Sequence, residues 1–275
     1  MTPATPRLLR VFRPNEEPAK GFRRILERMA AQAKLAERLS SDASSDSVHK
    51  TRVLIKHLRA LLWFAGAAIR SPEKDRIQAQ LWEASHLLAS QRDLEVTQAL
   101  LKKLSRKWTQ PLEPIAEKLT QATGHEADAV QQASSLLLKA LEEFVIQVNN
   151  VTRWPSLPVR LTKACRATKK AGKKALKSEA PAQFHRWRKK AKRLLYLLQW
   201  NLGQGKRIPL LIKGVDKLQR KLGQYHDCVI AEEQVEKNSL PTEKIPQSIG
   251  QLQKRQSRLK KSVRKLFRRL RPIRL

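Results

Sequence analysis

The sequence predicts an all-helical fold, and three observations lead to that prediction. Glycine is scarce, with 9 residues among 275, whereas good helix formers such as Ala, Leu, Gln, Glu, Lys and Arg are abundant. No segment keeps the alternation of apolar and polar residues that a half-buried strand requires. The hydrophobic content of 41% is sufficient for a core, so we expect a folded chain.

Prolines and polar clusters divide the first half into helices. Residues 1–18 contain four prolines and are predicted to form an extended arm. Breaks are expected at the Ser/Asp-rich segment 40–47 and before Pro72, because the residue preceding a proline disfavours helix. The helices predicted here span residues 19–39, 48–69 and 73–89, a stretch beginning near Asp93, and a long stretch that follows Pro111 and Pro114 and ends near Val148.

The segment 149–158, NNVTRWPSLP, is the best boundary between two halves, 19–148 and 159–275. Beyond it, the predicted helices span residues 159–177, 182–202 and 209–222, a shorter stretch after Asp227, and a last basic helix ending near Leu270. Four tryptophans with apolar neighbours are expected in the core: Trp63, Trp82, Trp187 and Trp200.

The formal net charge of +33 indicates an anionic partner, because self-repulsion on this scale opposes compaction. The charge is uneven: residues 1–137 contain 22 basic and 15 acidic residues, whereas residues 138–275 contain 35 and 9. A polymer of phosphates would balance such an excess better than a small acidic molecule.

An internal repeat places basic residues at matching positions of both halves. The motif His-x-x-Arg-x-x-x-Lys begins at His49 and again at His185, 136 residues later. A second pair of segments, Leu88 to Asp93 and Leu222 to Asp227, is displaced by 134 residues. In these segments Arg92 and His226 precede the Asp. Two motifs at nearly constant offset favour two related helical halves.

On a helix each motif forms a stripe of cations within an arc of about 80 to 100°. The stripes consist of His49, Arg52, Lys56 and Arg59, and of His185, Arg188, Lys189 and Lys192. A solvated helix face usually mixes acids with bases, but no acid occurs between His49 and Arg70 or between Ala180 and Lys206. The stripes are therefore interpreted as the walls of a basic channel for a long polyanion.

These segments resemble the CHAD family of α-helical domains. The resemblance is carried by VHKTRVLIKHLRALLWF (48–64), SQRDLEV (90–96), FHRWRKKAKRLLYLL (184–198) and LGQYHDCVI (222–230), and with the two-half layout it covers residues 19–270. It implies two four-helix bundles related by a pseudo-two-fold axis, with a basic central groove or pore. It also implies binding of inorganic polyphosphate, and a location on polyphosphate granules as in some members.

By motif match, the resemblance assigns polyphosphate binding to both stripes and to Arg92 and His226. Leu195 stands where the first motif has Arg59. Spacing alone adds Lys20 and Arg24 of the first helix. It also adds Lys163, Arg166, Lys170 and Lys173, which share one face of the helix 159–177.

Nucleic-acid binding is the alternative, because charge alone supports it equally well. Aromatic residues make up only 5% of the chain, and no known nucleic-acid motif occurs in it. Phosphatase or polyphosphate hydrolase activity is less favoured. The chain lacks clustered carboxylates, a zinc spacing and a Gly-rich phosphate loop. We therefore expect no catalysis, no metal and no cofactor.

Cys165 and Cys228 do not suggest a disulfide framework. No apolar segment is long enough to cross a membrane, and residues 1–18 do not resemble a secretory signal. A cytoplasmic location is expected.

Overall fold

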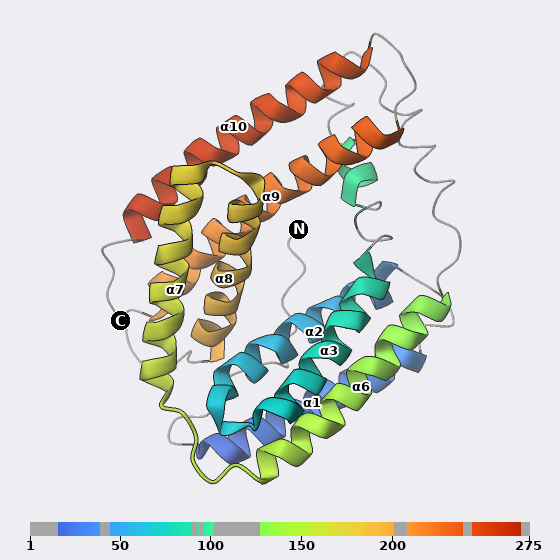
Figure 1. Cartoon of the computed structure of the whole chain (residues 1–275), viewed down its shortest axis with the longest axis vertical. Coiled ribbons are helices and arrows are strands. Elements are labelled where there is room, and N and C mark those ends of the chain that lie inside the picture. Colours follow the sequence, from blue (N-terminus) through green and yellow to red (C-terminus); the bar gives the residue numbers. More distant parts are fainter. Residues whose placement is uncertain are drawn as a thin grey trace. The chain divides into compact units, whose positions relative to one another are not determined.

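The computed structural model describes residues 16–38, 45–89, 93, 96–101, 127–200, 208–238 and 244–270. Every regular element in these residues is a helix, which confirms the all-helical prediction (Figure 1). Most of the predicted N-terminal arm and most of the segment between Asp93 and residue 126 lie outside the described residues.

The chain forms two compact units, and each combines several segments. Unit 1 consists of Met1–Ala89, His125–Lys163 and Tyr196–Leu210. Unit 2 consists of Ser90–Gly124, Ala164–Leu195 and Leu211–Leu275. The predicted linker 149–158 therefore falls within unit 1.

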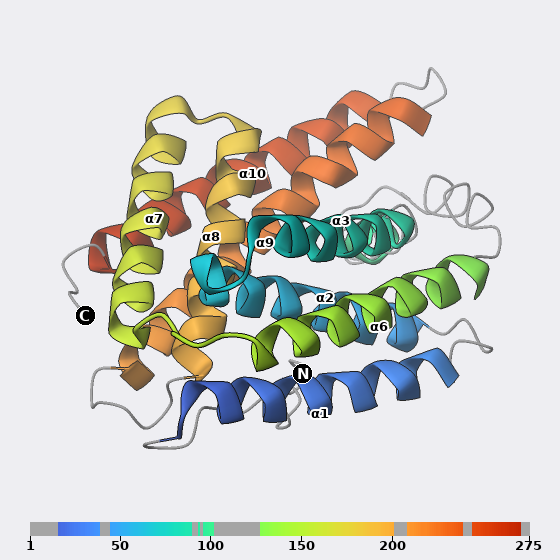
Figure 2. The ribbon, with the colours of Figure 1, turned by 60° about the horizontal axis from the view of Figure 1, so that its bottom comes forward.

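Unit 1 contains a bundle of helices from the first half of the chain. Helix α6 lies between α1 and α3, and α2 contacts all three (Figure 2). A short 3₁₀ helix, η3, follows α2. The bounds are α1 Pro18–Arg38, α2 Ser45–Ala65, η3 Gly66–Ala68, α3 Ser71–Leu87 and α6 Ala127–Asn149.

Aromatic side chains fill the centre of unit 1. The ring centroid of Phe22 lies 4.2 Å from that of Trp154, 5.3 Å from that of Phe64 and 6.5 Å from that of Phe144. The side of α2 opposite the cation stripe is buried as predicted, at Leu54, Leu58, Leu61 and Ala65. The amphipathic pattern therefore orients α2 with its apolar side in the core.

Unit 2 is built from α10 and most of α7, α8 and α9. Their bounds are α7 Leu157–Ser178, α8 Pro181–Trp200, α9 Ile208–Asn238 and α10 Lys244–Leu270. The core of the unit includes Trp187, Phe184, Tyr225 and Phe267. Helix α7 packs closely against α8 and α10 at Gly172. A Cβ atom at this position would lie 2.7 Å from the ring of Phe267 and 2.8 Å from that of Trp187.

The predicted break in α9 is wrong. A single helix runs from Ile208 to Asn238, so His226 lies in a helix and not in a loop. The apolar pattern of Leu218, Leu222 and Tyr225 continues to Cys228 and keeps one side of the helix in the core. Burial of this continuous side outweighs the roughly 1 kcal/mol that the glycine at position 223 costs a helix.

The tryptophan prediction is correct for Trp187 and Trp200, which are buried, whereas Trp63 is half-buried. Trp82 is 63% exposed on α3, so its assignment to the core was wrong. It stacks on His86 of the next turn, with 5.2 Å between the ring centroids. None of the described helices has an apolar stretch long enough to cross a bilayer.

Candidate anion-binding site

Helix α8 carries the second histidine motif, and its sequence determines which side of the helix faces the core. Phe184, Trp187 and Ala191 recur at spacings of three and four residues and are buried. The ring of Trp187 meets that of Phe267 of α10 edge-on, with 5.2 Å between centroids. His185 lies about 160° around the helix from Trp187, and Arg188 about 100°. Both motif residues are therefore directed away from α10.

Two histidines from different helices meet on this side of α8. The ring centroids of His185 on α8 and His226 on α9 are 4.4 Å apart. One turn earlier on α9, a Cβ atom at position 223 would lie 3.6 Å from Nε of Arg188. The arginine therefore passes within van der Waals distance of α9 at this position. We name His185, Arg188, Lys189 and His226 the His–Arg cluster.

Burial and neighbouring cations keep both histidines of the cluster neutral. Burial, followed by Lys189 and Arg188, lowers the pKa of His185 to about 4. Burial, followed by Arg188, His185 and Lys189, lowers the pKa of His226 to about 3. None of the groups that shift either pKa is an acid. An anion placed here would be attracted by Arg188 and Lys189, and its charge would raise the pKa of both rings.

The His–Arg cluster also contains an unused polar atom. Nδ1 of His185 is buried and has no hydrogen-bond partner among the described residues. A buried polar group without a partner destabilises the fold, so its retention favours a ligand that bonds to it.

The first histidine motif uses its arginines differently. Arg52 of α2 donates to the carbonyl oxygen of Leu88, the residue that follows the last turn of α3. Arg59 donates to the carbonyl oxygen of Leu81 at 2.9 Å, and burial lowers the pKa of this arginine. Both guanidinium groups thus bind the backbone of α3. Of the other two stripe residues, His49 is exposed and Lys56 is half-buried.

Several other predicted binding residues are placed by the structure. Lys20 forms an exposed ion pair with Glu17 at 3.4 Å. Arg24 pairs with Glu16 at 2.6 Å, and this hydrogen bond raises the pKa of the arginine. Lys192 is half-buried on the stripe of α8. Arg92 lies outside the described residues. The cations predicted on the outer face of α7 are exposed: Lys163, Arg166, Lys170 and Lys173.

The structure brings together, in unit 2, the motif on α8 and the segment that contains His226. Sequence reasoning missed that Arg188 reaches α9 at Gly223. No signal in the sequence indicated this contact. Among the described residues, no group of three or more His, Cys, Asp or Glu side chains could hold a metal ion.

These features define an all-helical protein with an electropositive cluster built from two helices. The chain belongs to the CHAD domain family, whose sequence profile matches residues 21–236. The crystal structure of the CHAD domain from the plant Ricinus communis is similar, with a TM-score of 0.73 and 18% identity over 97% of this chain and 96% of that chain. At this identity the likeness shows the fold alone. A search of curated protein sequences gave no match.

Proposed function

We propose that this protein binds inorganic polyphosphate without catalysis, and that the His–Arg cluster is part of the binding site. The observation that carries the proposal is the meeting of His185 and His226 beside Arg188 and Lys189, where every charge that acts on the rings is positive. A bound phosphate chain would be attracted by both cations and could accept a hydrogen bond from an imidazole.

The chemistry of the cluster suits a phosphate chain. Arginine presents a planar fork that grips two phosphate oxygens, whereas lysine acts as a point charge. A neutral imidazole donates one N–H, and a protonated one donates two. Polyphosphate has no bases, so its recognition needs spaced cations and no stacking platform.

The first motif supports the proposal in a second way. Arg52 binds the end of α3 at Leu88, and Arg188 crosses α9 at Gly223, the residue after Leu222. Leu88 and Leu222 are equivalent positions of the repeated segments, so the two motif arginines approach corresponding places. This correspondence favours two related sites, one in each half of the chain. Association with polyphosphate granules is expected of a protein with this activity.

Reversing the charge of both motif arginines tests the proposal. The double variant Arg52→Glu with Arg188→Glu is expected to lose polyphosphate affinity by at least about 100-fold, since each charge-assisted bond contributes roughly 1.5–3 kcal/mol. The matched control is Lys213→Glu with Lys217→Glu, on the exposed side of α9. Circular dichroism checks that both variants keep their helicity. Equal loss in variant and control would show that binding depends on diffuse charge.

A further inference from the structure

The outward faces of α7 and α10 in unit 2 carry cations that the His–Arg cluster does not use. Neither helix contains an acidic residue. On α10, the exposed cations Lys261, Lys265 and Arg268 lie within an arc of about 60° opposite the buried side formed by Leu259 and Val263. On α7, exposed cations likewise lie opposite Thr168 and Ala175. We define the outer basic surface by six of these: Arg166, Lys170, Lys173, Lys261, Lys265 and Arg268.

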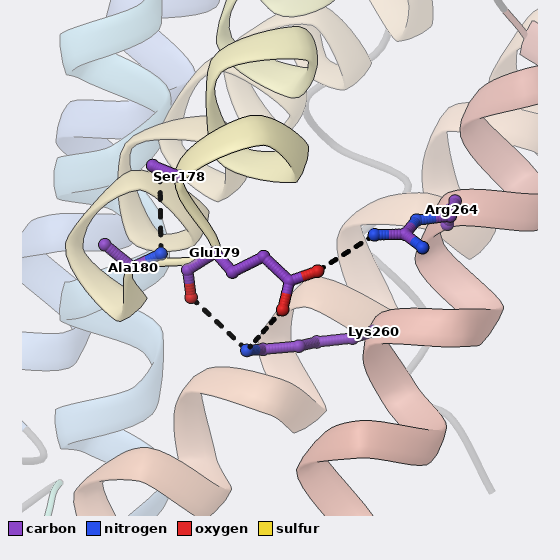
Figure 3. A network of polar contacts seen from close by, with 5 residues as sticks. All are labelled: Ser178, Glu179, Ala180, Lys260 and Arg264. Carbon is purple, nitrogen blue, oxygen red and sulfur yellow. Dashed lines mark hydrogen bonds and ion pairs between the residues drawn. The ribbon is translucent and has the colours of Figure 1, made fainter.

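The two helices lie side by side, so their cations form one surface. Gly172 of α7 is close to Phe267 of α10. At the end of α7, the Glu179 carboxylate accepts bonds from Arg264 at 2.9 Å and from Lys260 at 3.5 Å (Figure 3). Residue numbers rise along α7 as they fall along α10, so the two helices run in opposite directions where they meet.

Glu179 connects the end of α7 to α10. Its φ of 53° is left-handed, a conformation that costs a residue other than glycine roughly 1–2 kcal/mol. Its carboxylate and its carbonyl oxygen both accept from Lys260, as Figure 3 shows. Glu179 is therefore already engaged with Lys260 and Arg264. The six defining cations form no ion pair within the described residues.

The outer basic surface is separate from the His–Arg cluster. Trp187 of α8 contacts the inner sides of α7 and α10, at Gly172 and Phe267. The outer cations project away from that contact, whereas His185 and Arg188 face α9. The core of unit 2 thus lies between the two cationic regions.

We propose that the outer basic surface binds a second polyphosphate chain, so that one protein molecule bridges two polymers. This inference rests on the proposed function of the His–Arg cluster. The partner is a polyanion because the surface has cations on both helices and neither helix contains an acidic residue. A membrane is disfavoured because, among the described residues, Val159 near the start of α7 is the one large apolar side chain of α7 and α10 that is highly exposed. Nucleic-acid bases are disfavoured because the surface offers no aromatic side chain for stacking.

Stoichiometry with short polyphosphate tests bridging, because a short chain cannot reach both regions. Calorimetry on the intact protein is expected to give two chains per protein molecule. The variant with Lys170, Lys173, Lys261 and Lys265 each changed to Glu is expected to bind one chain, as is Arg188→Glu. A control with four equally exposed lysines changed to Glu, namely Lys139, Lys213, Lys217 and Lys237, is expected to keep both.

A capture assay gives an independent readout. Protein bound to immobilised long-chain polyphosphate is expected to retain labelled polyphosphate from solution, and the outer-surface variant is expected to lose at least about 90% of this retention. Light scattering of the free protein shows whether self-association accounts for any bridging that the variant keeps.

The outcomes separate the two proposals. One chain per wild-type molecule, or two chains per outer-surface variant, overturns the bridging inference. Preferential binding of duplex nucleic acid by the outer surface also overturns it. If Arg188→Glu still binds both chains while the outer-surface variant binds one, the outer basic surface binds polyphosphate and the His–Arg cluster does not.

Discussion

The two histidine motifs share a spacing and differ in what their side chains do. In the first motif, Arg52 and Arg59 donate to carbonyl oxygens of α3. In the second, His185 meets His226 and Arg188 crosses α9 at Gly223. Leu195 replaces the counterpart of Arg59 and is buried. A repeated sequence motif can thus support the bundle in one half and concentrate positive potential in the other.

Single reversals should reveal this asymmetry with the largest effect. Arg188→Glu is expected to lower polyphosphate affinity by about 10- to 100-fold, because it puts an acid inside the His–Arg cluster. Arg52→Glu is expected to lower affinity less and thermal stability more, since it loses its bond to Leu88 at the end of α3. Titration by fluorescence anisotropy and thermal unfolding measure the two effects. If both variants lost the same affinity and kept the wild-type stability, the two motifs would have the same role.

Binding should take up protons at the His–Arg cluster. The free rings of His185 and His226, with pKa values of about 4 and 3, are neutral at pH 7. A bound polyanion raises both values, so affinity rises as pH falls from about 7 to 5, at most about tenfold per pH unit for each proton taken up. Calorimetry in buffers of different ionisation enthalpy counts the protons. His185→Gln with His226→Gln should abolish the uptake, and unchanged uptake in that variant would place the protons elsewhere.

The same histidines should make the unliganded protein less stable in mild acid. Their folded-state pKa values lie below the unfolded value of about 6.5, so the unfolded chain binds more protons in acid. The free energy of unfolding therefore decreases as the pH is lowered. The loss begins below about pH 6.5 and continues toward pH 3. Urea unfolding across this range measures it. The double glutamine variant should show a shallower dependence, and an unchanged dependence would refute the assignment.

Arg59 should show the smallest effect on binding. Arg59→Met keeps much of the buried stem and removes the bond to the carbonyl oxygen of Leu81. The expected cost is about 1–2 kcal/mol in the free energy of unfolding, with an affinity loss smaller than that of Arg188→Glu. A loss of affinity equal to that of Arg188→Glu would show that both motifs bind polymer equally.

Helix positions and buried sides were predictable because they follow from local periodicity. The apolar side of α2 and the burial of Trp187 follow directly from residue spacing. The continuity of α9 through Gly223 was not predictable from local propensity, since it depends on burial of Leu222 and Tyr225. Trp82 was misplaced because its apolar neighbours in sequence do not surround it in space.

For the candidate site, the sequence proposed which cations bind the polyanion but did not indicate which protein groups these cations contact. Nothing in the spacing of the first motif indicates that Arg59 binds a carbonyl oxygen of α3. Pairing of Arg24 with Glu16 likewise depends on how the chain enters α1. The resemblance assigned polyphosphate binding to both His226 and the motif on α8, and in the structure the rings of His185 and His226 meet.

Competition binding at near-physiological salt tests the central claim most directly. Long-chain polyphosphate is set against single- and double-stranded nucleic acids of matched charge. We expect polyphosphate to bind at least about tenfold more tightly, a difference of about 1.4 kcal/mol, because the His–Arg cluster recognises phosphates without bases. Equal competition by all three polymers, with affinity falling with salt in proportion to charge, would contradict the account and identify a general polyanion binder.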